Sequence, residues 1–576
     1  MNIIDILPVA RGKVPADIIL KNCRIVNVFS GEIEKNNIAL FRKRIAGIGD
    51  YSNGKETIDV GGAYVVPGLI DGHLHIESSM LSPVEFARTV LPKGTTTAIA
   101  DPHEIANVLG LDGVDYMLKS TEGIPLNLYI MLPSAVPESS MVTSGASISV
   151  MDMIGFVEKH PRVLGLGEVM NYPGVINGDE ATIAKIELLR HKYKKIDGHI
   201  PGILDKDLNA YITAFIRSDH ECTTVEEAKE KLSKGMQILI REGSVARNLL
   251  PLLPLVNEKT YPFISFCTDD KQPNDILNEG HIDYMIRRSI EWGLDPVTAL
   301  RAATINTARH YNLRSMGAVA PGYKADLLIV NDLDKFDVSV VMKDSQIVAK
   351  DGKLTKNIGD KVKADSNVEV FRCPHFESSD FVVKSKDKPV RVIELQGEQV
   401  FTRQKIEEPA VNNGNLVNDL DRDILKLAAI CRYSKQKQFT MGLVSGTGLK
   451  KGAVATSVGH DAHNLSVMGV NDEDMATAAN RVIDLKGGLV IAESGKIIEE
   501  LPLPIAGLMS EFSGKKVAKK LGELKDVLDS YGCILPDLFM ALSFVQLSVI
   551  PELKITTNGL VNVTEGKFVS LFVEGD

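Results

Sequence analysis

The sequence predicts an α/β fold: a (β/α)8 TIM barrel, a small β domain formed from segments on both sides of it, and a C-terminal α+β domain. Three observations support this fold class. Eight short apolar runs alternate with helical patterns over about 250 residues, a typical length for such a barrel. Strand-rich segments flank that region on both sides, and the chain changes character after residue 355.

These changes along the chain define the expected domains. We expect residues 1–60 and 310–355 to form the small β domain and residues 61–309 the metal-dependent barrel. Residues 356–388 are expected to be a charged connector, and residues 389–576 the C-terminal domain. A chain of 576 residues is long enough for two or three domains.

Composition restricts the partners of this chain. The net charge is -10 and there is no strongly basic block, which argues against a nucleic-acid partner. The chain has six scattered cysteines, no signal-peptide pattern and no apolar run long enough to span a membrane. We therefore expect a cytoplasmic protein with a small-molecule substrate and no membrane partner, and a homo-oligomer, either a dimer or a tetramer.

The flanking segments have the patterns of short strands. Residues 16–20, 24–27 and 37–41 are apolar runs separated by turn residues, and residues 325–330 and 345–348 repeat the pattern downstream. Two such segments predict one β domain built from both. The alternative is a chance similarity between short strand-like sequences.

The central region contains eight candidate strands with helical stretches between them. The helical stretches include residues 83–91, 181–193 and 224–234. The strands are expected at residues 65–73, 95–100, 126–132, 163–168, 196–200, 214–219, 237–240 and 262–268.

Histidines and acidic residues fall at the ends of seven of these eight runs. The active site of a TIM barrel lies at the C-terminal ends of its strands, so this placement predicts a site there. The candidates, in chain order, are His73, His75, Asp101, His103, Glu104, Glu168, His199, His220, Arg241, Glu242 and Asp269.

The pair His73 and His75 is the first indication of a metal site. Side chains alternate faces along a strand, so both imidazoles point the same way at the end of an apolar run. A single buried histidine is usually a satisfied core residue, but a His-x-His pair behind Pro67-Gly68 is typical of metal ligation.

Four histidines and two carboxylates suit two divalent ions better than one. His73, His75 and Asp269 would hold one ion, and His199 and His220 the other. Glu168 is the natural bridge between them. Imidazole with carboxylate suits zinc, iron(II) or manganese.

These positions resemble the ligand pattern of the amidohydrolase superfamily. Residues 66–79 and 100–108, the run Arg241-Glu242-Gly243-Ser244 and the loop 459–464 are similar to the bacterial adenine deaminase family over essentially the full length. That resemblance implies hydrolysis of adenine to hypoxanthine and ammonia in purine salvage, with two divalent ions, manganese or iron(II). Many relatives with two metals use a carboxylated lysine as the bridge, and Glu168 argues against a dihydropyrimidinase or dihydroorotase.

The remaining candidates have open roles. Asp269 is expected to be both ligand and proton shuttle. Glu104 or Asp101 would donate to or hold the purine ring, and Asp101 has the alternative of a turn cap. Glu104 is not expected to be a metal ligand, because six other residues complete the set.

Four further residues carry alternatives of their own. His103 could orient Glu104, touch substrate or bind an extra metal. Arg241 and Glu242 are either substrate contacts or a structural ion pair. His460 and His463 lie in a glycine-flanked loop whose spacing is weak evidence for metal, so a loop or substrate-contact role is favoured.

Two other functions compete with a purine deaminase. The first is an amidohydrolase that opens a cyclic amide or acts on another aminated ring, and Glu168 argues against the ring-opening enzyme. The second is a non-catalytic scaffold, which would be expected to lose metal ligands, whereas all six positions are filled here.

Overall fold

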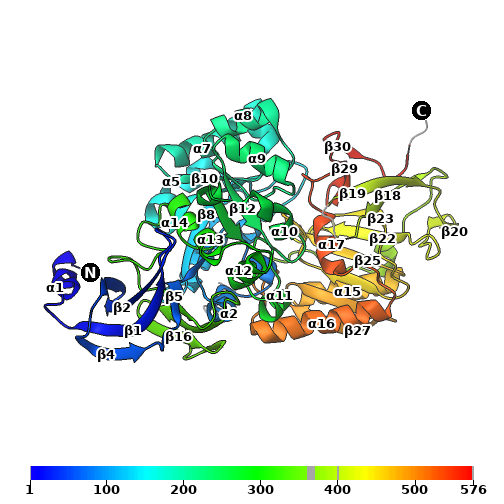
Figure 1. Cartoon of the computed structure of the whole chain (residues 1–576). Coiled ribbons are helices and arrows are strands. Elements are labelled where there is room, and N and C mark those ends of the chain that lie inside the picture. The colour runs from blue at the N-terminus through cyan, green and yellow to red at the C-terminus, as the bar shows by residue number, and fades with distance from the viewer. Residues whose placement is uncertain (1, 360–369, 398–400, 574–576) are drawn as a thin grey trace.

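The computed structural model describes residues 2–359, 370–397 and 401–573 and has mixed α/β architecture. Three sheets dominate it. In Figure 1 the N-terminal sheet lies at the left, the parallel strands and their helices lie in the middle, and the C-terminal region lies at the right.

The N-terminal sheet contains nine strands from two distant parts of the chain. In this sheet β14 pairs with β5, and β5 pairs with β1. Its strands are β1 (Ala16–Val26), β2 (Ile33–Phe41), β3 (Arg44–Gly49), β4 (Gly54–Asp59), β5 (Tyr64–Pro67), β14 (Leu327–Val330), β15 (Val338–Lys343), β16 (Gln346–Lys350) and β17 (Lys353–Leu354).

The site is carried by a curled parallel sheet of eight strands, paired as a group of five and a group of three. At one seam Asp269 N–H donates to His73 O (3.0 Å), and at the other Arg217 N–H donates to Ile196 O (3.2 Å). The strands are β6 (Leu69–Leu74), β7 (Thr95–Ala100), β8 (Asn127–Leu132), β9 (Val163–Val169), β10 (Lys195–Gly198), β11 (Ser218–Asp219), β12 (Gln237–Arg241) and β13 (Ile264–Cys267).

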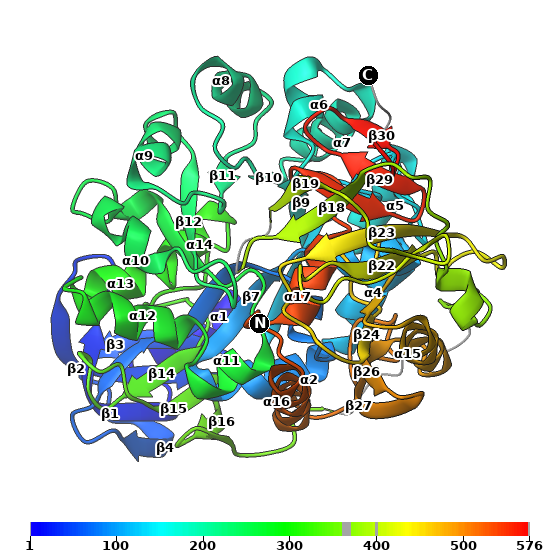
Figure 2. The same cartoon turned by 90° about the vertical axis from the view of Figure 1, so that its right-hand side faces the viewer.

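Helices follow most of these strands and cover the outside of the sheet (Figure 2). Several begin at side-chain caps that satisfy free N–H groups, such as Ser82 for α2 and Thr224 for α9. The principal helices are α2 (Pro83–Val90), α3 (His103–Leu109), α4 (Leu111–Ser120), α5 (Val150–Lys159), α7 (Glu180–His191), α8 (Asp205–Thr213), α9 (Val225–Ser233), α12 (Ile282–Glu291) and α13 (Pro296–Ala302).

The strand predicted over residues 65–73 is wrong in one respect, because the chain forms two strands there. β5 pairs with β14 in the N-terminal sheet, whereas β6 pairs with β7 in the parallel sheet. The chain changes sheets at Gly68, whose N–H donates to Asp326 O (2.8 Å). A Cβ at this position would lie 2.3 Å from Thr96 Oγ1, so glycine permits the close approach of the two segments.

The strand predicted over residues 214–219 is also too long. Only Ser218 and Asp219 are extended, because Ala214 closes the last turn of α8 and its N–H donates to Ala210 O and Tyr211 O. Of the apolar residues just before Ser218, Ile216 is buried whereas Phe215 is exposed, and neither belongs to a strand.

The C-terminal region is built on an eight-stranded sheet in the order β19-β18-β23-β22-β25-β24-β26-β27. Of the predicted connector, residues 360–369 lie outside the described residues. The strands are β18 (Val390–Leu395), β19 (Thr402–Glu407), β22 (Leu425–Ile430), β23 (Phe439–Ser445), β24 (Ala453–Thr456), β25 (Leu465–Gly469), β26 (Gly488–Glu493) and β27 (Lys496–Pro502), with helices α15 (Asp472–Asp484), α16 (Gly514–Ser530) and α17 (Leu538–Phe544).

Candidate metal centre

The six predicted ligands lie together at the C-terminal ends of the parallel strands. His73 is near the end of β6, Glu168 is near the end of β9, and Asp269 follows β13. His75, His199 and His220 follow β6, β10 and β11. Of the six, His199 is the most exposed, with 18% of its side chain accessible, whereas the other five are almost fully buried.

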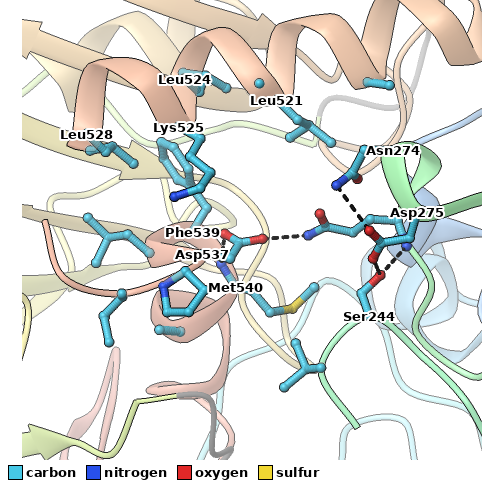
Figure 3. A pocket seen from close by; sticks show the side chains of 18 of the residues that line it. Ser244, Asn274, Asp275, Leu521, Leu524, Lys525, Leu528, Asp537, Phe539 and Met540 are labelled. Carbon is cyan, nitrogen blue, oxygen red and sulfur yellow. Dashed lines mark hydrogen bonds between the residues drawn. The ribbon is translucent and has the colours of Figure 1, made fainter. Parts of the chain in front are cut away.

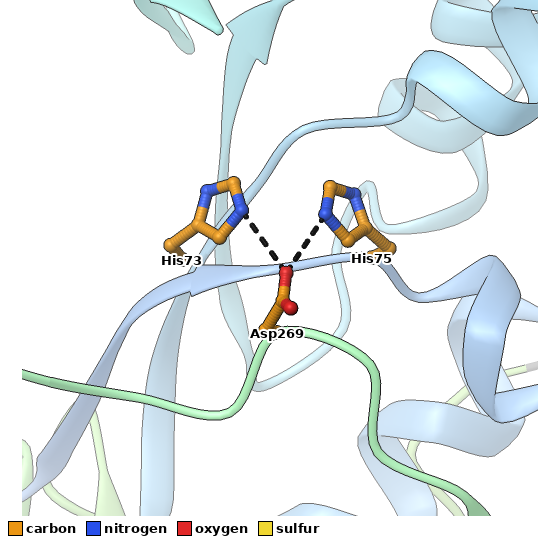
Figure 4. Close-up of side chains that lie close together, drawn as sticks. All are labelled: His73, His75 and Asp269. Carbon is orange, nitrogen blue, oxygen red and sulfur yellow. Dashed lines mark ion pairs between the residues drawn. The ribbon is translucent and has the colours of Figure 1, made fainter. Parts of the chain in front are cut away.

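His73, His75 and Asp269 form a compact group of three donors (Figure 4). Asp269 Oδ1 lies 3.3 Å from His73 Nε2 and 3.1 Å from His75 Nε2. His75 Nδ1 lies 2.7 Å from Asp101 O, so the other ring nitrogen is free to face Asp269. This arrangement holds the imidazole in the orientation that a metal ligand needs.

Glu168 joins this group to the two remaining histidines. Its Oε1 lies 3.3 Å from His75 Nε2. Its Oε2 lies 2.8 Å from His199 Nδ1 and 3.1 Å from His220 Nε2. Each carboxylate oxygen therefore faces a different group of imidazoles, which is the geometry required of a bridge between two ions.

The donor atoms of this site fit metal binding. The sets His73–His75–Asp269 and His73–Glu168–His220 each place one donor per residue within 4.8 Å of the others. His73 Nε2 is buried and has no hydrogen-bond partner in the described part of the chain. A buried ring nitrogen without a partner is costly unless something else binds it.

The two carboxylates are held in the ionised form. Burial alone would raise the pKa of Asp269, but the Arg241 guanidinium and the neighbouring imidazoles of His73 and His75 hold that pKa well below its usual range. Burial opposes ionisation of Glu168 as well, and hydrogen bonds from His199, His220 and His75 lower its pKa well below the usual value. Both groups are therefore available as anionic ligands.

Asp101 supports Glu168 and does not act as a turn cap. Its Oδ2 accepts the Glu168 N–H at 2.9 Å, and the N-cap residue of α3 is Pro102, which makes no side-chain cap bond. The carboxylate occupies the space beside Gly167, where a Cβ would lie 2.0 Å from Oδ2. Asp101 thus positions the strand segment that carries Glu168.

Arg241 forms ion pairs with Asp269 and with Glu221, neither of which the sequence predicted. Its Nη1 donates to Asp269 Oδ2 at 2.9 Å and also pairs with Glu221. Glu221 was not among the candidates predicted from the sequence, although its position directly after His220 at a strand end was a usable signal. Glu242 lies elsewhere and accepts the Leu249 N–H (3.1 Å) at the start of α10 (Leu249–Leu252).

His103 and Glu104 lie on the other side of the site, at the first turn of α3, next to a loop of the C-terminal region. His103 Nδ1 lies 3.4 Å from Glu168 Oε1, and Glu104 Oε1 accepts the Ser78 hydroxyl at 2.7 Å. His460 Nδ1 lies 3.6 Å from Glu104 Oε1, and His463 Nε2 lies 3.9 Å from Glu104 Oε2. The loop histidines His460 and His463 therefore face the first turn of α3 across the contact between the two regions.

Two family models match the chain. The model described as the amidohydrolase family matches residues 64–348, and the model described as the adenine deaminase C-terminal domain matches residues 399–567. The adenine deaminase of Kosmotoga olearia is 71% identical over 573 residues, which are 100% of this chain and 99% of that protein.

The chain belongs to the adenine deaminase family.

A second family member, the adenine deaminase of Thermosipho africanus, is 54% identical over 576 residues, with 100% of both chains covered. Among solved structures, the β-aspartyl dipeptidase of Fervidobacterium islandicum AW-1 is 19% identical with a TM-score of 0.46, covering 59% of this chain and 97% of that chain. In the described residues of this family member, no helix is both long enough and apolar enough to cross a membrane.

Proposed function

We propose that this chain catalyses the hydrolytic deamination of adenine to hypoxanthine and ammonia at a binuclear metal centre, as a step of purine salvage. Membership of the adenine deaminase family supports the substrate. The observation that carries the binuclear proposal is Glu168, whose two oxygens face separate groups of histidines.

We propose that His73, His75 and Asp269 hold one divalent transition-metal ion, that His199 and His220 hold the other, and that Glu168 lies between them. Manganese or iron(II) is the expected metal, with zinc as the alternative. When bound, such a pair lowers the pKa of water, so that hydroxide is available to attack carbon at neutral pH.

Asp269 is proposed as the proton shuttle. Its Oδ1 faces the histidine pair and can accept a proton from the attacking water, while Arg241 holds Oδ2 in place. The water oxygen bonds to C6 of adenine, and the bond from C6 to the amino nitrogen breaks. One proton goes to the ring nitrogen beside C6, and another leaves with ammonia.

Adenine is proposed to approach from the side of His199, Glu221 and Arg241. These side chains are 18%, 13% and 10% accessible, more than the other side chains of the site. Arg241 Nε is buried and has no hydrogen-bond partner in the described residues, so its N–H is available to a ring nitrogen acceptor. This supports substrate contact as one of the two roles that the sequence left open for Arg241, beside its ion pairs with Glu221 and Asp269.

The proposal extends to a closed barrel, a β domain built from both flanks and a homo-oligomer. Hydrogen bonds at both seams of the parallel sheet support a closed (β/α)8 barrel. The nine-stranded sheet supports a β domain made from both flanks, with the strand β5 extending it to Pro67. The division into domains near residues 60, 310, 355 and 388, the homo-oligomer and the cytoplasmic location remain predictions.

An ammonia-release screen combined with metal analysis tests the function. The purified chain is assayed with adenine, guanine, cytosine, adenosine and hydantoins, at known metal content. We expect ammonia from adenine, in proportion to occupancy of two ions per chain. Ring opening of a hydantoin without ammonia release, or full activity with one ion, would overturn the proposal.

A further inference from the structure

A second cluster of ionisable side chains lies where the C-terminal region packs against α3. We call His103, Glu104, His460 and Asp461 the interdomain cluster. The first two begin α3, and the last two lie in the loop between β24 and β25. None of the four side chains is more than 6% accessible.

The distances within the interdomain cluster are those of metal ligands and not of hydrogen bonds. His460 Nδ1 lies 3.6 Å from both Glu104 Oε1 and Asp461 Oδ1, and His103 Nε2 lies 3.7 Å from Asp461 Oδ1. Hydrogen bonds between such groups are about 2.7–3.2 Å long. Donors placed tetrahedrally at ~2.0–2.2 Å from one ion are about 3.3–3.6 Å apart.

The candidate binuclear centre of the same chain provides an internal comparison. There Asp269 Oδ1 lies 3.3 Å from His73 Nε2 and 3.1 Å from His75 Nε2. The interdomain cluster has the same chemistry, two imidazoles and two carboxylates, at separations a few tenths of an ångström larger. His103, Glu104 and His460 each offer one donor atom, and these three atoms all lie within 4.8 Å of one another.

Several polar atoms around the interdomain cluster are buried without a partner. Glu104 Oε2, Asp461 Oδ2, His463 Nε2 and His103 Nδ1 make no hydrogen bond to any described residue. The Ser78 hydroxyl has one proton but lies 2.7 Å from Glu104 Oε1 and 2.5 Å from Asp270 Oδ1. The Ser78 proton can therefore serve only one of these two carboxylates at a time, and buried negative charge of this kind is unfavourable unless a cation compensates it.

The loop that carries His460 is held firmly in place. The His460 ring stacks on Phe544 with centroids 4.8 Å apart, and the backbone N–H of His460 donates to Ser543 O at 3.0 Å. Tyr433 donates to Ala462 O at 2.6 Å. A site fixed in this way loses little conformational entropy when an ion binds.

A cavity borders the aromatic residue that stacks on His460. It has a volume of about 650 Å³ and lies between α16, the start of α17 and the loops after β12 and β13 (Figure 3). Phe544, which stacks on His460, is part of its lining. Ser244 lines the opposite side, and its N–H donates to Asp270 O (2.8 Å), next to the carboxylate that faces Ser78. The cavity therefore comes within one side chain of His460.

We propose that His103, Glu104, His460 and Asp461 bind a third divalent transition-metal ion, which fastens the C-terminal region to the parallel sheet beside the binuclear centre. The separations of 3.6 to 3.7 Å leave room for an ion but not for a purine ring. The third ion assigns Glu104 to metal binding and not to direct contact with adenine. It does not depend on the identity of the substrate.

Metal stoichiometry of the full chain tests this proposal. The protein is loaded with Mn²⁺, freed of excess ion by gel filtration and analysed by mass spectrometry of the metal. We expect about three ions per chain in the wild type, and one fewer in His460→Ala and in Asp461→Asn. His375→Ala is the matched control, because His375 is exposed and pairs only with Asp484 in the described residues.

Glu104→Gln separates the two roles of that residue. Loss of one ion supports the third site, whereas unchanged metal content with reduced turnover supports direct purine contact and overturns the proposal. Anomalous diffraction at the manganese edge gives a readout independent of the folding of any variant. A wild-type peak beside His460 is expected, and its absence in a crystal with both other peaks would refute the third ion.

Discussion

Gly167→Ala is expected to damage the metal centre although residue 167 contributes no ligand. The new Cβ would lie 2.0 Å from Asp101 Oδ2 and 2.6 Å from Asp101 Cγ, whereas ordinary contacts begin at 3.4 Å. Asp101 is fully buried and accepts the Glu168 N–H at 2.9 Å. Either the Asp101 carboxylate or the strand that carries Glu168 must move.

The magnitude follows from this overlap. Relief requires a displacement of about 1.4 Å, and misplacement of a catalytic group by ~1 Å can cost about 10²-fold in rate. Loss of the Asp101 hydrogen bond leaves a buried N–H unpaired, at a cost of ~1–3 kcal/mol. We therefore expect kcat/KM for adenine to fall by about 10²-fold, together with weaker metal retention.

Steady-state kinetics and metal analysis on matched variants measure the effect. Gly155→Ala is the control, since Gly155 is an exposed residue of α5 and an added Cβ would meet nothing within 4 Å. Asp101→Ala removes the group with which the new Cβ collides. Adding Gly167→Ala to that background should then lower kcat/KM and metal content much less than it does in the wild type.

Two results would refute the reasoning. The first is wild-type kcat/KM and metal content in Gly167→Ala. The second is an equal loss from Gly167→Ala with and without the Asp101 side chain, because the damage would then not pass through Asp101.

Three further predictions follow from the site. Glu168→Gln keeps the size of the side chain but removes the charge that faces both groups of histidines, so both ions and activity should be lost together; metal analysis that finds two ions in an active variant would contradict the bridge. Asp269→Asn should lower turnover by at least ~10²–10⁴-fold, measured as ammonia release at saturating metal, since the proton acceptor is removed. Arg241→Gln removes the positive charge that lowers the pKa of Asp269. That pKa should rise, so the acidic limb of the pH–rate profile should move to higher pH. An unmoved limb would show that Arg241 does not act through the charge of Asp269.

The sequence by itself determined the parts of this protein that depend on local pattern. The apolar run ending in His73 and His75 encodes a strand and the shared face of two imidazoles, since side chains alternate along extended chain. Carboxylates and histidines after successive apolar runs predicted one site, because parallel strands present their C-terminal ends at the same edge. The structure brings the six expected ligands together there.

Only the tertiary structure decided which neighbours these groups have. Strand pattern could not reveal that the run at residues 65–73 changes sheets at Gly68, because both halves are apolar and the change depends on pairing with β14. Nor could it reveal that Arg241 pairs with both Glu221 and Asp269.

The loop histidines are the clearest case of this limit. In the sequence, His460 lies in a glycine-flanked loop far from α3, and its spacing predicts little. In the structure the ring lies 3.6 Å from Glu104, because the C-terminal region packs over the ends of the parallel strands. Local periodicity specifies the face and the end of an element, whereas contacts between regions depend on how buried surfaces fit together, which no single segment encodes.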